Sequence, residues 1–445
     1  MNLIEDAWIP VRLRDGTRDD IRPADIVGAG SGDPNPPVGL ECPRPDFNGA
    51  LAQFLVGLLQ TFAAPEDEVE WEEFFFEPPS PGELHARLAE FTGAFEVFGS
   101  QRFLHGIQDL GATRRKSLLE LLLDSPGGST RRHNKDLFIK RRAKFPLCPE
   151  CAATAIITMQ LNAPSGGRGH RTSIRGGGPV TTLLQGESLW EDVWLNIQPK
   201  ELFDGFENPT ETNLAYILPW MAPTRISDDD GVDTFPEDTH PLQVFWAMPR
   251  RLQLEEPDQS EPGTCSLCGV ENTPLCHGYR DKSYGVNYQG VWIHPLTPYT
   301  FSDKNEPNPL KASQDGFAYK HWRGLVIEHE EIGRKPARVV RHFRRQREPV
   351  LRRQSSTPQI RVWAFGYDTD NAKIRSWQDG EMPLVLVEDE LREAVDRFAR
   401  DLVVAANDSE GRLKNALKKA LYGTPGTTST GKQTWDYDDR ASVDK

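Results

Sequence analysis

The apolar positions along the chain change their period several times, and this predicts helices and strands in mixed order. Within 46–63 the apolar residues recur at 51, 54, 55, 58, 59 and 62, the spacing of one helical face, and Asp46 stands at the expected N-cap. Similar spacing predicts two more helices, over 82–98 and 387–421, and short helices are expected over 115–124 and 152–161. We interpret these stripes as faces packed in a core.

Other segments have the pattern of strands. Apolar runs on both sides of Asp15-Gly16 predict a hairpin within 1–23, followed by a loop over 24–45. The remaining strands are expected at 179–184, 284–293 and 358–366, and a polar turn is expected at 367–374. The segment 334–353 has features of both strand and helix. Together the elements predict an α+β fold.

Composition narrows the class of protein. The chain has 445 residues, 37% of them hydrophobic and 27% charged, with 37 Gly and 35 Pro. This composition excludes a coiled coil, a collagen-like chain and a fully disordered one, and the length suggests two or three domains. No apolar run approaches the ~18 residues of a membrane span. The acidic N-terminus is unlike a signal peptide, so we expect a cytoplasmic protein.

The net charge of −14 hides two basic islands. The first, 131–145, contains Arg131, Arg132, Lys135, Lys140, Arg141, Arg142 and Lys144 against one acid. The second, 334–353, contains Arg334, Lys335, Arg338, Arg341, Arg344, Arg345, Arg347, Arg352 and Arg353, also against one acid. Arginine holds phosphate oxygens in a bidentate fork, so these islands indicate nucleic-acid contact along defined tracks. The alternative is a solvated face that acids elsewhere neutralise.

Four of the six cysteines form two C-x-x-C pairs, Cys148 with Cys151 and Cys265 with Cys268. Two such knuckles supply the four thiolates of a closed structural zinc site, which leaves no position for a catalytic water. The long separation implies that zinc staples two distant chain segments. One alternative is a disulfide, which a reducing cytoplasm disfavours. The other is a redox C-x-x-C, which would need only one pair. Cys42 and Cys276 are interpreted as bystanders.

The stretch 165–186 contains a glycine-rich loop that carries Arg168, Arg171 and Arg175. Bare glycine lets the backbone approach a phosphate or a base edge where a Cβ would clash. The loop precedes a strand and lacks G-K-[ST], so it is neither a Walker A loop nor a dinucleotide fingerprint. A mobile hairpin tip is the alternative.

Motifs typical of enzymes are not convincing in this sequence. The histidines are scattered, and only His170 lies in a candidate functional segment, the glycine-rich loop. The run Asp228-Asp229-Asp230 is interpreted as a solvated loop rather than a metal site.

Several segments, in order, resemble the CasA family, the large subunit of the type I-E CRISPR surveillance complex Cascade. They are NLIEDAWIPVR at the start, the CPEC and CSLC pairs, IRGGGPVTTL, GVWIHPLTPY and LKKALY. The resemblance runs from residue 1 to about 422. It implies a non-catalytic protein that reads the short motif beside the target (the PAM), helps open the DNA duplex and docks the helicase-nuclease. The implied partners are guide RNA, double-stranded target DNA and other Cascade subunits, without a membrane.

The resemblance also assigns residues. The family's glycine loop, which lies in the minor groove of the motif, matches Gly166, Gly167, Arg168 and Gly169, and its lysine finger matches Lys282. The family's wedge, a glutamine on a hairpin tip, matches Asp370, Asn371 and Ala372, with Asn371 in place of the glutamine. The early loop that packs on the guide handle matches the first basic island, with Phe138 as its aromatic residue. In the second island, phosphate contacts are expected from Arg341, Arg344, Arg345, Arg352 and Arg353.

The resemblance implies a large mixed α/β domain, here 1–385 with the zinc knuckles, and then a four-helix bundle. Residues 386–424 supply only part of such a bundle, and 425–445 form a polar tail expected to be disordered. The missing helices are either absent or supplied by another chain.

Two other functions remain open from the sequence. One is a zinc-stapled nuclease or nucleic-acid-processing enzyme with an unrecognised site. The other is an interaction module whose arginine stripes bind acidic proteins. Metal-dependent cleavage favours the first, and salt-insensitive protein binding favours the second.

Overall fold

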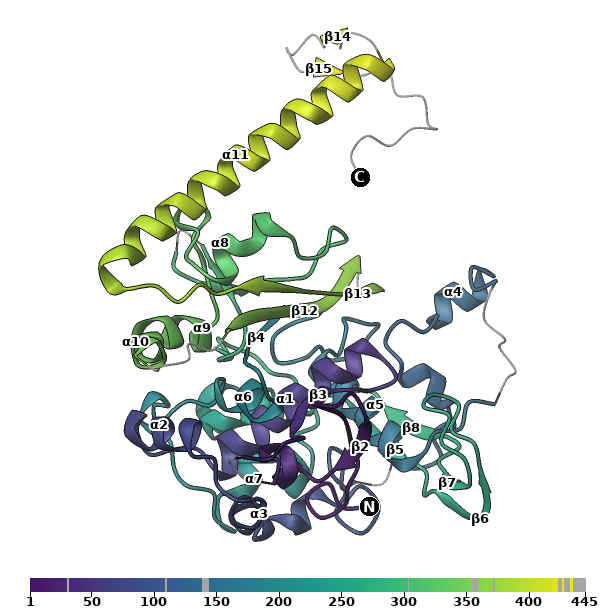
Figure 1. Ribbon diagram of the computed structural model, residues 1–445. Helices are drawn as coiled ribbons and strands as arrows, with labels where there is room; N and C mark the ends of the chain where they lie inside the picture. Colours follow the sequence, from purple (N-terminus) through teal and green to yellow (C-terminus); the bar gives the residue numbers. More distant parts are fainter. Residues whose placement is uncertain are drawn as a thin grey trace.

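The computed structural model describes residues 1–29, 32–108, 110–137, 144–302, 304–353, 359–370, 373–422, 426–427 and 433–434. Most of the chain forms one body, and a long C-terminal helix lies across its upper side (Figure 1). No helix in these ranges is both long and apolar enough to cross a membrane.

The centre of the body is α1 (Pro45–Phe62), which packs against α5 (Pro149–Leu161). Nearly every side chain of α1 is buried, because Leu51, Leu55 and Leu58 meet neighbours on several sides of the helix. Phe54 makes edge-to-face contacts with Trp8, Phe95, Phe103 and Trp246. Aromatic side chains from distant segments thus form one core around this helix.

Shorter elements cover this core. The helices are α2 (Glu68–Phe76), α3 (Pro81–Ala89), α6 (Leu189–Trp194) and α7 (Leu214–Ile217), while the short α4 (Gly128–Arg132) lies apart from the core. A three-stranded sheet in the order β2-β1-β3 is formed by β1 (Ile9–Leu13), β2 (Arg18–Ile21) and β3 (Pro37–Leu40). Two small antiparallel pairs join β5 (Arg251–Leu254) to β8 (Tyr279–Lys282) and β6 (Asp258–Gly263) to β7 (Thr273–Leu275).

A second sheet, in the order β13-β12-β4, connects the middle of the chain to its late part. It consists of β4 (Thr181–Gln185), β12 (Arg361–Asp370) and β13 (Lys373–Pro383). β12 pairs antiparallel with both neighbours, Phe365 opposite Thr181 on one side and Asp379 on the other. The β12–β13 hairpin extends beyond β4, so residues 366–370 and the residues of β13 opposite them project from the three-stranded part of the sheet (Figure 1).

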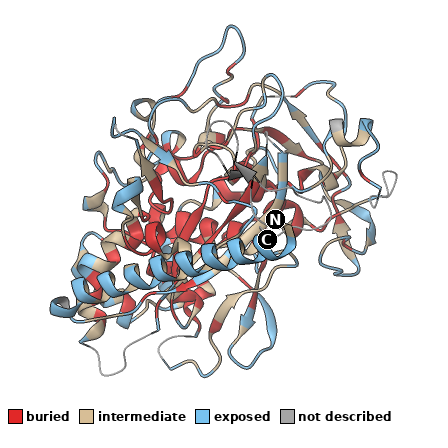
Figure 2. Ribbon diagram, turned by 90° about the horizontal axis from the view of Figure 1, so that it is seen from above, coloured by how far each residue is buried: buried red, intermediate tan, exposed pale blue. Residues whose placement is uncertain are grey.

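The late part of the chain packs on this sheet. A small sheet is formed by β9 (Tyr299–Phe301), β10 (Pro307–Pro309) and β11 (Arg334–Lys335). The helices are α8 (Trp322–Leu325), α9 (Arg338–His342), α10 (Glu348–Arg352) and the 34-residue α11 (Asp389–Tyr422), with a π-helical turn at Phe343–Arg347. In Figure 2, α11 is largely exposed along its length while the core behind it is buried. Past α11, β14 (Gly426–Thr427) pairs with β15 (Gln433–Thr434), and the rest of the predicted disordered tail lies outside the described residues.

Several predicted elements are confirmed. They are the N-terminal hairpin, the helices over 46–63, 152–161 and 387–421, the strands at 179–184 and 358–366, and the mixed character of 334–353. The polar turn expected at 367–374 is shorter, since both strands of the hairpin extend into it. Segment 24–45 also contains β3, which the loop prediction missed.

Other predictions were wrong for identifiable reasons. The helix expected over 82–98 ends at Ala89, and a 3-10 turn at Thr92–Phe95 then turns Phe95 into the core. Segment 115–124 holds only a 3-10 turn, Leu118–Leu121. The strand expected over 284–293 does not form, because Tyr284 and Gly290 have positive φ. Asp46 does not cap α1; its carboxylate pairs with Arg44 and accepts from the Tyr367 hydroxyl.

Candidate nucleic-acid interface and metal centre

The glycine loop leaves the C-terminal end of α5 and crosses to the edge of β8. Gly169 has φ +79°, and a Cβ there would lie 2.9 Å from Ser283 Cβ. A Cβ on Gly166 would lie 2.6 Å from His170 Cβ, whereas one on Gly167 would meet no atom within 4 Å. Gly166 and Gly169 are therefore required by packing inside the protein, and Gly167 faces open space.

Tyr284 holds the loop from the other side. Its N–H donates to the Gly169 carbonyl at 2.8 Å, and Arg171 lies over its ring at 5.8 Å. Tyr284 has φ +65°, which is costly for a bulky residue and typical of functional sites. The glycine loop is thus tied to the segment that follows β8.

Lys282 ends β8, two residues before Tyr284. Its side chain is exposed, and its Cα pairs across the strands with Arg251. Since Gly169 packs on Ser283, the predicted lysine finger and the predicted glycine loop are neighbours in the fold although more than a hundred residues separate them in the sequence.

The β12–β13 hairpin is braced near its tip by Arg375. The guanidinium bonds both carboxylate oxygens of buried Asp368, at 2.6 and 2.8 Å, and lies 3.6 Å from Asp370. A bidentate pair of this kind fixes the orientation of both side chains. Asn371 and Ala372, the predicted wedge, lie outside the described residues, so the structure describes the base of this tip and not its end.

One cleft joins the glycine loop to this hairpin. It has a volume of about 630 Å³, and Gly166 and Gly167 line it together with Lys373 and Ile374 of β13. Further along, Gly178 packs against Thr369 of β12 so closely that a Cβ would lie 2.8 Å from it. The two elements predicted to act on DNA therefore border the same space.

The cleft has a cationic group in its wall. Arg250 Nη1 lies 2.6 Å from His170 Nδ1, and Arg250 Nη2 donates to the Pro164 carbonyl at 2.5 Å. Burial, helped by the charge of Arg250, lowers the pKa of His170. Neutral His170 can therefore accept from the guanidinium, and Arg250 supplies the charge at this point of the loop.

The acidic run predicted as a solvated loop lies against the glycine loop. Asp229 forms an ion pair with Arg168 at 3.1 Å, and Arg171 donates to the Ser227 hydroxyl at 2.7 Å. A second cleft of about 690 Å³ is lined by both loops. The run is exposed, as predicted, but its position was missed, because no local pattern relates residues about sixty positions apart.

The first basic island is described in part. α4 carries Arg131 and Arg132 and stands away from the body, with Lys135 just beyond it (Figure 1). Arg131 pairs with Glu120 at 3.0 Å, while Arg132 and Lys135 are exposed. Four further predicted handle contacts lie outside the described residues: Phe138, Lys140, Arg141 and Arg142.

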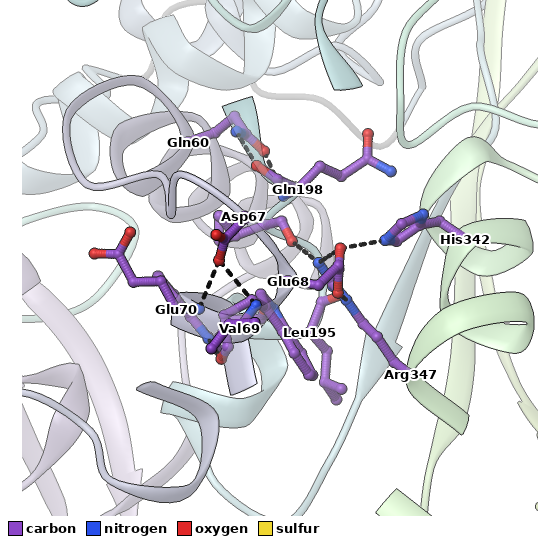
Figure 3. A network of polar contacts seen from close by, with 12 residues as sticks. Gln60, Asp67, Glu68, Val69, Glu70, Leu195, Gln198, His342 and Arg347 are labelled. Carbon is purple, nitrogen blue, oxygen red and sulfur yellow. Dashed lines mark hydrogen bonds and ion pairs between the residues drawn. The ribbon is translucent and has the colours of Figure 1, made fainter. Parts of the chain in front are cut away.

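Much of the second island is engaged inside the protein. Arg347 is 2% exposed, donates to the carbonyls of Leu195 and Ile197, and pairs with Glu68, which also bonds His342 at 2.5 Å (Figure 3). This network holds the π-helical turn against α2. Arg347 is thus a structural residue, although its sequence neighbourhood looks like a phosphate track.

The predicted phosphate contacts divide in the same way. Arg344 pairs with Asp396 of α11 at 2.9 Å, and Arg352 donates to the Val387 carbonyl. Arg345 and Arg353 are exposed. Arg341 is half-buried and lines, with Arg345 and Arg400, a cleft of about 260 Å³ beside α11.

The four predicted zinc cysteines form one cluster, with their sulfur atoms within 4.8 Å of one another. Cys148 and Cys268 come from different knuckles, and their Sγ atoms are 3.7 Å apart. Zn–S bonds of about 2.3 Å place tetrahedral sulfurs about 3.8 Å apart, so the spacing fits a four-thiolate zinc site. The Sγ atoms of Cys148 and Cys265 each accept from a backbone N–H at 3.5 Å, as thiolate ligands do.

This cluster joins the start of α5 to the β6–β7 hairpin. Cys148 is the N-cap of α5, and Ser266 in the second knuckle donates to the Pro146 carbonyl. Cys42 and Cys276 lie outside the cluster, and burial raises the pKa of the Cys276 thiol to about 12. The predicted contact between two distant segments is present, and the cluster can hold a metal ion.

Comparison with known proteins identifies the family. A family model described as CRISPR-associated protein Cse1 matches residues 2–442. The chain belongs to the Cse1 family. Cse1, also called CasA, is the large-subunit family of type I-E Cascade, and this membership confirms the resemblance found in the sequence.

Solved structures of the family show the same fold. Cse1 of Thermobifida fusca has 19% sequence identity and a TM-score of 0.70, over 93% of this chain and 79% of that one. CasA of Thermus thermophilus has 18% identity and a TM-score of 0.69, over 95% and 84%. A chain of a structure titled "CRISPR RNA-guided surveillance complex" has 16% identity and a TM-score of 0.69, over 95% and 83%.

Proposed function

We propose that this Cse1-family chain is a non-catalytic subunit of an RNA-guided surveillance complex, that it reads the PAM on duplex DNA and that it helps to open the duplex. The observation that carries the proposal is the shared cleft: Gly167 of the glycine loop and Lys373 of the hairpin line the same space. A duplex whose minor groove lies on the glycine loop meets the hairpin at its next base pairs. Reading and opening are then consecutive contacts of one DNA molecule.

The chemistry of the loop fits minor-groove reading. A backbone without Cβ atoms can enter the narrow groove, where the donor and acceptor pattern is degenerate. We therefore expect a tolerant motif preference. Lys282 is exposed beside the loop and supplies a phosphate or base-edge contact, while Asn371 at the hairpin tip is the proposed wedge.

Other surfaces take the remaining partners. α4 and the segment after it contact the guide RNA handle and neighbouring subunits through Arg132, Lys135 and Phe138. Arg345 and Arg353 are the exposed members of the second island and contact phosphate. The body also docks the helicase-nuclease, and the thiolate cluster holds structural zinc.

Gly167→Ala tests this function sharply. The added methyl group meets nothing within 4 Å in the protein, so folding is unaffected, but the group would project into the DNA groove. We expect the complex, reassembled with guide RNA, to lose at least tenfold in affinity for targets with the preferred motif. Gly93→Ala, where a Cβ also meets nothing within 4 Å, is the matched control and should change nothing.

Binding is measured on targets with a randomised flanking motif at two salt concentrations. Motif-dependent binding that Gly167→Ala abolishes and Gly93→Ala preserves supports the proposal. Equal binding by both variants, without motif dependence, excludes the glycine loop as the reader. Metal-dependent cleavage by the purified chain would instead favour the nuclease hypothesis.

A further inference from the structure

The second cleft, between the glycine loop and the acidic run 228–230, carries more negative than positive side chains, which is unfavourable for binding DNA. Its cationic side chains are Arg168 and Arg171, and its acidic ones are Asp228, Asp229 and Asp233. Burial keeps the pKa of His170 low, so His170 adds no charge near neutral pH. Three carboxylates against two guanidinium groups repel a phosphate backbone. A duplex must overcome this repulsion to reach the loop.

The acidic residues lie on a tip that is fixed at its base and at Asp233, whose carboxylate accepts from the Asn287 side-chain amide at 2.7 Å. On one side the Ser227 hydroxyl donates to the Gly285 carbonyl at 2.6 Å, and on the other the Thr234 N–H donates to the Asn287 carbonyl at 2.9 Å. Ser227 and Thr234 are buried, whereas every residue from 228 to 233 is exposed. The Asp228 and Asp229 side chains can therefore move without breaking the contacts that anchor the tip.

The contact between the two loops is one that a phosphate can replace. Arg168 and Asp229 are 3.1 Å apart, but their side chains are 79% and 85% exposed. Water and salt screen such a pair, and its strength is small. A phosphate offers the same guanidinium another bidentate partner of higher charge. Asp229 thus occupies the position where phosphate would bind.

From this geometry we propose that the tip 228–233 is an electrostatic gate on the glycine loop. Its carboxylates bind or mask Arg168 and Arg171 in the absence of DNA, and duplex enters only by displacing them. The gate weakens binding to every duplex, so the complex dissociates quickly from DNA that offers no further contact. Only a correct motif and guide pairing compensate for the loss. This inference rests on the proposed function, since it assumes that DNA reaches the glycine loop.

A double-mutant cycle on the assembled complex tests the gate. The variants are Arg168→Ala, Asp229→Asn and both together, and the readout is affinity for a duplex without the motif. We expect Arg168→Ala alone to reduce affinity by less than twofold, because Asp229 already occupies the arginine. In the Asp229→Asn background the same change should reduce affinity about tenfold. Replacing Asp228, Asp229 and Asp230 by Asn should raise affinity about tenfold at low salt.

Salt dependence separates the gate from a structural role. Freed arginines contact phosphate and release counterions, so the slope of log affinity against log salt should steepen by about 1–2 in the triple variant. The matched control changes three charges on and directly after α2, in a segment that lines neither cleft: Glu72→Gln, Glu73→Gln and Glu77→Gln. It should leave the slope unchanged.

The outcomes are distinguishable from failure of the proposed function. Motif-dependent binding with no coupling between Arg168 and Asp229 overturns the gate and leaves the proposed function standing. Coupling without motif dependence supports the gate and removes PAM reading. A complex that binds no duplex in any variant overturns both. If the tip variant and the α2 control change affinity equally, the change in net charge explains both effects, and the gate is also overturned.

Discussion

Two arginines of one basic island, Arg345 and Arg347, have opposite roles. Arg347 is buried among Glu68, two backbone carbonyls and Trp71, whose ring lies 3.8 Å from its guanidinium carbon. Arg345 is exposed. Spacing along the sequence could not separate them, because the partners of Arg347 come from residues more than a hundred positions away.

This difference gives a paired prediction. Arg347→Ala leaves two buried carbonyls without their donor and the Glu68 carboxylate with only His342, so the free energy of unfolding should fall by about 3–5 kcal/mol. Arg345→Ala should change it by less than about 0.5 kcal/mol. Chemical denaturation of the two variants measures both values. Equal stabilities would show that the network in Figure 3 contributes little.

Buried His105 predicts a dependence of stability on pH. Its Nδ1 lies 2.6 Å from the Phe103 carbonyl and its Nε2 accepts from the Leu254 N–H, so the ring is neutral. Burial lowers its pKa to about 4 from 6.5. The unfolded chain therefore takes up a proton as pH falls below 6.5 while the folded chain does not.

Stability is lost over this window, between pH 6.5 and 4, by about 2 kcal/mol at pH 5. His105→Gln can donate and accept as His105 does and does not titrate, so its stability should fall less between pH 7 and pH 5. Urea unfolding at the two pH values gives the difference. Identical losses in both proteins would assign the acid sensitivity to other groups.

At the scale of elements, helices with a full apolar face were predictable and short turns were not. α1 follows from periodicity alone, whereas α5, which is buried nearly all round, was predicted as a short helix without such a stripe. The predicted helix 82–98 was wrong because a 3-10 turn keeps apolar spacing while it changes direction, so Phe95 remains in the core without a helix. The β3 strand was missed because Pro and Gly make up half of it and it gains order only by pairing with β1.

The cluster of Cys148, Cys151, Cys265 and Cys268 was predictable because the spacing of the two C-x-x-C pairs is itself the signal. We expect one zinc ion per chain by elemental analysis, and Cys265→Ser should lower the free energy of unfolding by about 3 kcal/mol or more. The loss should loosen the contact between α5 and the β6–β7 hairpin, which faster amide exchange at Ser266 reports. Cys42→Ala, a thiol outside the cluster, is the control. No effect of Cys265→Ser on either readout would exclude a structural metal.

At the scale of the molecule, the candidate site depends on contacts that no local pattern contains. The sequence supported each of its parts, the glycine loop, Lys282 and the hairpin, through their resemblance to a family. The meeting of the loop and the hairpin in one cleft, and the position of Lys282 beside the loop, needed the fold, because α5, β8 and β13 come from three distant parts of the chain. The contact between Asp229 and Arg168 likewise could not be predicted from local sequence.

The C-terminal helix α11 has exposed apolar side chains that do not pack on the body. α11 carries an outward apolar stripe in which Phe398, Leu402 and Leu413 are 64%, 53% and 60% exposed. Its contacts with the body are largely polar, through Asp396 to Arg344 and through Glu410 to Tyr319. Apolar side chains that remain in water contribute little to folding of this chain.

Replacing Leu413 and Leu417 by Glu should therefore leave the free energy of unfolding within about 0.5 kcal/mol of the original value. Leu59→Ala in fully buried α1 should cost about 2–5 kcal/mol, because it removes contacts and leaves a cavity. Both variants are compared by denaturant unfolding of the full chain. If the glutamate pair destabilised the chain as much as Leu59→Ala, the stripe would have to pack on the body in solution. If both changes in the free energy of unfolding are as expected, the apolar core that stabilises the chain lies in the body and not along α11.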